Sequence, residues 1–146
     1  MSYAIDVNLL LYASDTASPH QQTAVRFLKR CAAGRELLCL CWSTVFGYLR
    51  IATHPSIFDN PLTPQDAAGN IEALIQLPHV RLLAEEEGYW EIYREVTEGM
   101  AVRGNLVPDA HLAAVLVQNG IKLLYTNDSD FKRFSFLRVK NPLDAD

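Results

Sequence analysis

Short apolar runs alternate with helix-like segments along this chain, and that alternation limits its fold more than any other feature. Runs of strand length lie at residues 3–6, 37–41, 80–83, 121–125 and 137–139. The segments between them place apolar residues at helical spacing. Strands that alternate with helices predict an α/β layer fold with a mostly parallel sheet. Ligands of such sheets bind at the carboxyl ends of the strands, where the strand order changes direction.

The expected helices carry recognisable start and stop signals. Ser18-Pro19 predicts a helix with Ser18 as its N-cap, and Gly34 predicts its end. Thr63-Pro64 repeats the start signal for a later helix. Further helices are expected at residues 7–13, 42–52, 85–100 and 109–118. The last of these is apolar on nearly every face, which predicts a helix buried in the middle of the fold.

Composition indicates one globular domain over residues 1–146, with 49% apolar and 21% charged residues. No apolar run approaches the roughly 20 residues of a membrane span, and the N-terminus lacks a secretory pattern. A cytoplasmic protein without a membrane partner is therefore expected. The three cysteines lie in apolar contexts and suit small core residues better than zinc ligands. A net charge of −4 argues against a general nucleic-acid coat, but it leaves room for a local basic patch.

Four aspartates stand where apolar strand-like runs pass into helices or turns. Asp6 ends the first run, Asp109 opens the buried helix, and Asp128 and Asp130 follow the run at 121–125. Each has an ordinary structural explanation as a helix cap, a partner of the helix dipole or a turn residue.

Convergence of these carboxylates on one sheet edge would make a site. Oxygen ligands without thiolates or imidazoles favour Mg²⁺ or Mn²⁺, the kind of ion that phosphodiester hydrolysis needs. Asn8 is expected to support the ligands or to serve only as a turn residue. Thr126 is expected to bond a ligand oxygen or to cap its own loop.

Three segments carry a family resemblance: Ile-Asp-Val-Asn at 5–8, Gly-Asn-Leu-Val-Pro-Asp-Ala-His at 104–111 and Thr-Asn-Asp-Ser-Asp-Phe at 126–131. Together they resemble the PIN-domain ribonucleases, in particular VapC-type toxins. The resemblance implies a three-layer sandwich with a mostly parallel five-stranded sheet between helices. It implies Mg²⁺- or Mn²⁺-dependent cleavage of RNA, with Asp6, Asp109 and Asp128 as catalytic metal ligands and Asp130 beside them. It also implies a cognate antitoxin and a homodimer.

One departure from the family keeps alternatives open. Many PIN domains carry a further acid on the helix after the second strand, whereas this chain has Gly47 there. Ser43 and Thr44 are candidate polar substitutes. The site could then bind one ion tightly and a second only with substrate. A catalytically weak or silent PIN-like binding module is one alternative function, and a receiver-like signalling domain, which also gathers aspartates around Mg²⁺, is another.

Overall fold

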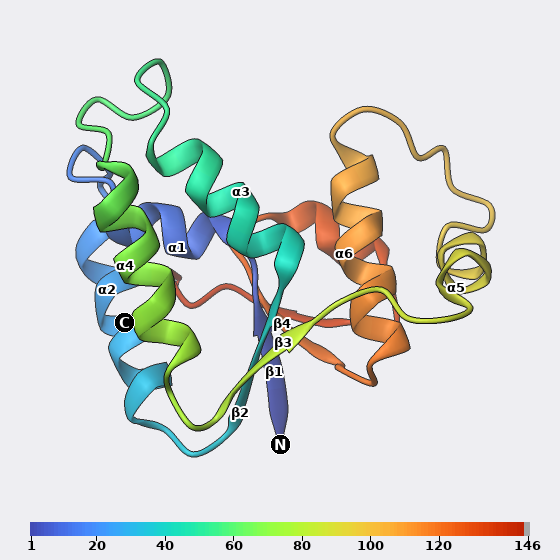
Figure 1. Ribbon diagram of the computed structural model, residues 1–146. Helices are drawn as coiled ribbons and strands as arrows, with labels where there is room; N and C mark the ends of the chain where they lie inside the picture. The colour runs from blue at the N-terminus through green and yellow to red at the C-terminus, as the bar shows by residue number, and fades with distance from the viewer. Residues whose placement is uncertain (145–146) are drawn as a thin grey trace.

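A five-stranded sheet organises residues 1–144, the part of the chain that the computed structural model describes (Figure 1). Its strand order is β3-β2-β1-β4-β5, and every neighbouring pair runs parallel. The strands are β1 (Ser2–Ile5), β2 (Leu37–Cys41), β3 (Val80–Leu83), β4 (Leu123–Tyr125) and β5 (Arg138–Lys140). All five strands coincide closely with the apolar runs of the sequence. The predicted sheet is therefore confirmed.

Helices cover both faces of this sheet (Figure 1). One face carries α1 (Val7–Ser14), α2 (Gln21–Ala33), α3 (Trp42–Ala52) and α4 (Pro64–Ile75). The other face carries α5 (Tyr89–Val96), α6 (Leu106–Gln118) and the 3₁₀ helix η1 (Ser129–Arg133). The three-layer sandwich expected from the family resemblance is thus observed.

Alternation along the strands divides the core into two apolar clusters, because successive side chains of a strand point to opposite faces. In β1, Tyr3 and Ile5 pack toward the α1–α4 face, while Ala4 packs toward α6. Cys39 and Cys41 also face α6 as free, buried thiols, as the sequence indicated. On the opposite face of the sheet, Cys31 of α2 is likewise a buried free thiol.

Two helix predictions are wrong in detail. Helix α2 begins at Gln21, and the Ser18 hydroxyl accepts a hydrogen bond from the backbone N–H of His20 at 3.1 Å. Ser18 therefore stabilises a turn before the helix instead of capping it. The helix predicted over 85–100 is confined to α5, because Gly88 adopts φ 83°, a left-handed conformation that interrupts a helix. The Gln118 side chain instead bonds backbone groups of Glu86 and Glu87.

The strand order also decides between functional alternatives. Receiver-type folds follow the order 2-1-3-4-5. The order here is β3-β2-β1-β4-β5, so the receiver-like alternative is excluded by topology. Within residues 1–144, no helix combines the length and the apolar character needed to cross a bilayer.

Helix α6 should dominate the stability of the fold. Leu116 is fully buried in it, so Leu116→Ala should lower the free energy of unfolding by about 2–5 kcal/mol through lost burial and a residual cavity. Val107 lies on the same helix but is 43% exposed, and Val107→Ala should change stability by less than about 0.5 kcal/mol. Urea unfolding followed by circular dichroism measures both. Equal effects would contradict the central placement of α6.

Candidate active site

Asp6 and Thr126 meet at the carboxyl edge of the sheet, between the central strands β1 and β4. From β1 the chain continues to β2 and β3 on one side of the sheet, whereas β4 and β5 lie on the other side of β1. The strand order therefore changes direction between β1 and β4. Asp6 follows β1 directly, and Thr126 follows β4. Ligands of open α/β sheets bind at such a crevice. Topology alone therefore marks the place to look for chemistry.

Asp6 is held on both carboxylate oxygens. Its Oδ1 accepts a hydrogen bond from the backbone N–H of Val7 at 2.8 Å, and its Oδ2 accepts one from the Thr126 hydroxyl at 2.7 Å. Asp6 is thus the N-cap of α1, with the backbone N–H of Val7 as its donor. Burial raises the pKa of Asp6, the two hydrogen bonds lower it, and the negative charge of Asp128 raises it again.

Thr126 links Asp6 to the loop that follows β4. Its side chain is 1% exposed, and its oxygen accepts hydrogen bonds from the backbone N–H of Asp128 at 3.0 Å and from Asn8 Nδ2 at 3.3 Å. Asn8 Oδ1 in turn accepts a longer bond, 3.5 Å, from the backbone N–H of Asn127. Both Asn8 and Thr126 therefore tie the start of α1 to the aspartate loop.

Three carboxylates gather beside this link. One oxygen from each of Asp109, Asp128 and Asp130 lies within 4.8 Å of the others. Asp109 comes from the first turn of α6, whereas Asp128 caps η1 by accepting the Asp130 backbone N–H at 2.9 Å. We call these three residues together with Asp6 the acidic niche.

The closeness of the carboxylates in the acidic niche affects the pKa of Asp109. Burial, and after it the charges of Asp128, Asp6 and Asp130, raise the pKa of Asp109 to about 6. Within residues 1–144, the niche makes one ion pair: Arg133 Nη2 lies 4.0 Å from Asp130 Oδ1, in an exposed pair of little energetic weight. The niche is a cluster of carboxylates without a buried counter-charge among the described residues.

The structure brings all four predicted aspartates to one edge, but not in equal roles. Asp6 is near enough to raise the pKa of Asp109, yet its carboxylate is not among the three within 4.8 Å. Asp130, to which the sequence assigned no firm role, is among them. Its Asp-x-Asp spacing after a strand was the available signal, because a 3₁₀ turn brings its side chain back beside Asp128.

The structure leaves room for a side chain at Gly47, where many PIN domains carry the helix acid. A Cβ built on Gly47 would have its nearest neighbour, Val7 Cγ2, at 3.7 Å, an ordinary contact distance. Of the candidate substitutes, Ser43 is exposed and Thr44 is buried. His111 does not belong to the niche, since its ring pairs with Glu85 at 3.6 Å on the surface.

The donors of the niche fit a divalent cation of the Mg²⁺ class. All are carboxylate oxygens, and no thiol or imidazole stands among them. A cation would also relieve the mutual repulsion that raises the pKa of Asp109. The chemistry of the donor set and its electrostatics point in the same direction.

Comparison with known proteins agrees with this chemistry. A family model described as PIN domain matches residues 3–137. Ribonuclease VapC48 of Mycobacterium tuberculosis is 42% identical over 142 residues, covering 97% of this chain and 98% of the relative. Ribonuclease VapC43 of the same species is 34% identical over 141 residues, covering 97% of this chain and 95% of the relative.

Solved structures with low sequence identity share the fold. VapC20 of Mycobacterium tuberculosis, described as a sarcin-ricin loop cleaving toxin, superposes with a TM-score of 0.66 at 17% identity and covers 94% of this chain and 98% of its own. VapBC2 of Rickettsia felis, solved on a fragment of its promoter DNA, gives the same TM-score and identity with 97% and 98% coverage. At these identities the likeness establishes the architecture alone.

Neutralising Asp109 should stabilise the metal-free protein. Because the pKa of Asp109 is raised in the folded state, protonation of its carboxyl group stabilises the folded protein. This stabilisation is lost as pH rises through about 6, and above that pH the charged carboxylate opposes folding. Well above it, Asp109→Asn should raise the free energy of unfolding by roughly 1–2 kcal/mol, after discounting for partial exposure. The gain should vanish toward low pH.

Asp59→Asn is the matched control, because Asp59 is exposed and outside the niche. Urea titrations in chelator at several pH values measure both variants. Destabilisation by Asp109→Asn at neutral pH would contradict the crowding of the niche.

Proposed function

This chain belongs to the PIN-domain family, and we propose that it is a ribonuclease that uses the acidic niche to hydrolyse RNA with a bound Mg²⁺ or Mn²⁺ ion. The catalytic domain in this proposal spans residues 1–146. The observation that carries it is the group of carboxylates from Asp109, Asp128 and Asp130 within 4.8 Å, beside Asp6, at the switch point of the sheet. The identity of the curated relatives, both named ribonucleases, supports the reaction class.

Asp6, Asp109 and Asp128 are the proposed ligands and catalytic residues, with Asp130 next to them. Although both oxygens of Asp6 accept hydrogen bonds, each carboxylate oxygen has a second lone pair that can face an ion. When bound, the ion would activate a water molecule and offset charge on the phosphodiester.

The chain's own residues position these groups. Thr126 and the Val7 backbone N–H fix the Asp6 carboxylate, and the backbone N–H of Asp130 fixes that of Asp128. Asn8 holds the loop that carries Asp128 against α1. Substrate would thus meet carboxylates that are already oriented, which lowers the reorganisation needed for reaction.

A toxin role with a protein antitoxin is part of the proposal. Solved structures of similar fold are VapBC complexes, including one from Rickettsia felis and one from Salmonella typhimurium bound to DNA. Exposed apolar side chains offer contact area for an antitoxin or for a second copy in a homodimer. These include Trp42, Phe46 and Trp90, which are 41%, 62% and 61% exposed. A cytoplasmic site of action, where RNA is available, belongs to the same proposal.

A catalytically weak or silent PIN-like module remains the second candidate. Gly47 favours it, because the niche has no acid from α3 and so fewer ligands for a second ion. Asp130 offsets this lack by adding a carboxylate from η1. The two candidates differ in one measurable respect, the cleavage of RNA by the purified chain with metal.

The purified chain should cleave single-stranded RNA in Mg²⁺ or Mn²⁺ and stop when a chelator removes the ion. Asp128→Asn should lower the cleavage rate by roughly a thousandfold, because the metal contributes several kcal/mol to transition-state stabilisation. Asp59→Asn should leave the rate unchanged. A fluorogenic RNA assay measures the rates, and circular dichroism checks that each variant is folded. Full activity of Asp128→Asn, or cleavage unaffected by chelator, would refute the proposal.

Asp130 should contribute to metal binding directly. Asp130→Asn should weaken Mn²⁺ binding by roughly 10–100-fold, the range seen when groups that support a metal site are removed. Electron paramagnetic resonance of free Mn²⁺ measures the affinity without reference to activity. An unchanged affinity would place Asp130 outside the metal site, whatever the result for cleavage.

A further inference from the structure

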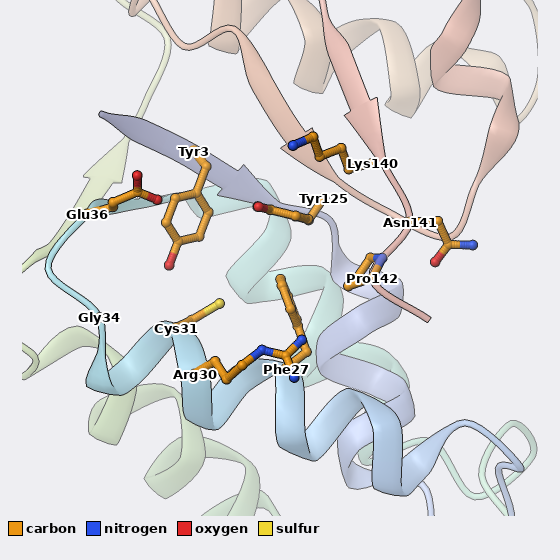
Figure 2. Close-up of a pocket in the computed structure, with 10 residues that line it drawn as sticks. All are labelled: Tyr3, Phe27, Arg30, Cys31, Gly34, Glu36, Tyr125, Lys140, Asn141 and Pro142. Carbon is orange, nitrogen blue, oxygen red and sulfur yellow. The ribbon is translucent and has the colours of Figure 1, made fainter. Parts of the chain in front are cut away.

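A hollow of about 330 Å³ lies between α2 and the sheet, toward the β5 edge (Figure 2). We call it the tyrosine hollow. Figure 2 shows the ring of Tyr3 reaching from β1 toward α2 and the ring of Tyr125 lying along the strands, while Phe27 and Cys31 point up from α2. The ring centroids of Phe27 and Tyr125 are 5.0 Å apart, so the aromatic wall is continuous. Its volume suits a small planar group.

The polar lining of the tyrosine hollow is cationic on balance. Arg30 stands on the α2 wall and Lys140 on the strand wall, with the single acid Glu36 at one end (Figure 2). This local charge is positive, although the whole chain carries −4. The hydroxyl of Tyr125 forms no hydrogen bond with any side chain or backbone group of residues 1–144, so it is available to a ligand.

A second hollow borders the loop that carries Asp128. It measures about 200 Å³ and is lined by Lys132 and Ser129 of η1, among others. Asn141 lines both hollows, and Asp128 lines the second hollow and belongs to the acidic niche. The second hollow therefore shares one lining residue with the tyrosine hollow and one with the acidic niche.

The local charge of the segment beside these hollows favours binding of a polyanion. The segment 122–140 carries five exposed cations and two carboxylates, a net charge of +3. The cations are Lys122, Lys132, Arg133, Arg138 and Lys140. By contrast, the segment 85–98 carries six glutamates and one arginine, a net charge of −5. A strand of RNA is thus drawn to the β4–β5 edge and repelled from α5.

We propose that the tyrosine hollow binds one nucleotide of single-stranded RNA whose backbone passes the acidic niche. The base lies against the partly exposed ring of Tyr125, which the buried Phe27 supports from the core side, and the cations of Arg30 and Lys140 contact the phosphates beside it. Single-stranded RNA is commonly held in this way, by aromatic faces beside a basic track. The inference rests on the proposed ribonuclease function and adds to it a substrate subsite distant from the reacting bond.

RNA affinity tests the subsite without turnover. In an Asp109→Asn background with Mg²⁺, a labelled single-stranded RNA is titrated at several salt concentrations and followed by fluorescence anisotropy. The Arg30→Gln/Lys140→Gln variant should bind roughly tenfold more weakly. The slope of log affinity against log salt should fall by about 1.4, because each of two lost phosphate contacts contributes about 0.7 on single strands.

Arg26→Gln/Lys29→Gln is the matched control. It removes two exposed cations from α2, the helix that carries Arg30, but neither residue lines the tyrosine hollow. Its RNA affinity and salt slope should stay at the value of the Asp109→Asn background. A general charge effect would instead weaken both double variants equally and overturn the proposal.

Base contact is tested separately by titrating adenosine and uridine monophosphates into the full chain under amide NMR. The largest shifts should fall on residues that line the tyrosine hollow, among them Cys31, Tyr125 and Lys140. Shifts confined to the acidic niche would refute the subsite.

Cleavage by the unmutated chain separates this inference from the proposed function. If that chain cleaves RNA while the Arg30/Lys140 variant binds RNA like its control, the subsite is wrong and the ribonuclease proposal stands. If it cleaves no RNA in Mg²⁺ or Mn²⁺, the proposed function itself falls. A variant that keeps its RNA affinity but loses its protein antitoxin would assign the hollow to that partner and overturn the RNA subsite.

Discussion

The hydrogen bond from the Thr126 hydroxyl to Asp6 Oδ2, 2.7 Å long, joins residues 120 positions apart in the chain. Thr126 is 1% exposed and Asp6 is 9% exposed, so either group left unpaired would carry a large desolvation penalty. The bond therefore holds the end of β4 against the end of β1. Because the aspartate loop continues directly from Thr126, the same bond sets where Asp128 leaves the sheet. Site geometry here follows from strand pairing.

The acidic niche lowers the stability of the folded, metal-free protein. Burial and neighbouring carboxylates raise the pKa of Asp6 and of Asp109, and no buried cation within the described residues compensates them. Helix α6 offsets that repulsion: Ala113, Ala114 and Leu116 are fully buried, so its apolar packing holds Asp109 in place despite the charge. Strain of this kind is typical of sites that are completed by a ligand. The same carboxylates thus lower the stability of the metal-free protein and provide the ligands for a cation.

The architecture could be predicted from the sequence because each strand coincides with a short apolar run. Sequence reasoning placed Asp6 and Asp128 at one edge because strand ends of a parallel sheet meet there, whereas Asp109 was singled out by the buried helix that it opens and by the family resemblance. It failed where long-range contacts override local signals: Gln118 bonds the backbone of Glu86 and Glu87, and Gly88 ends any helix there. The closeness of Asp130 to Asp109 depends on how η1 packs on α6, which no local pattern specifies. The tyrosine hollow was equally hidden, since its walls come from distant segments.

A net charge of −4 does not conflict with an RNA substrate once the charges are placed. The glutamates of segment 85–98 lie on α5 and on both sides of it, whereas the five cations lie just before β4, in η1 and in β5. Fields at short range depend on local charge, because salt screens exposed charges over about 8–10 Å. A polyanion close to β4, η1 and β5 therefore experiences the basic segment more strongly than the acidic one. The carboxylates of the niche, which would repel phosphate alone, are the one part of that path that needs a cation to become attractive.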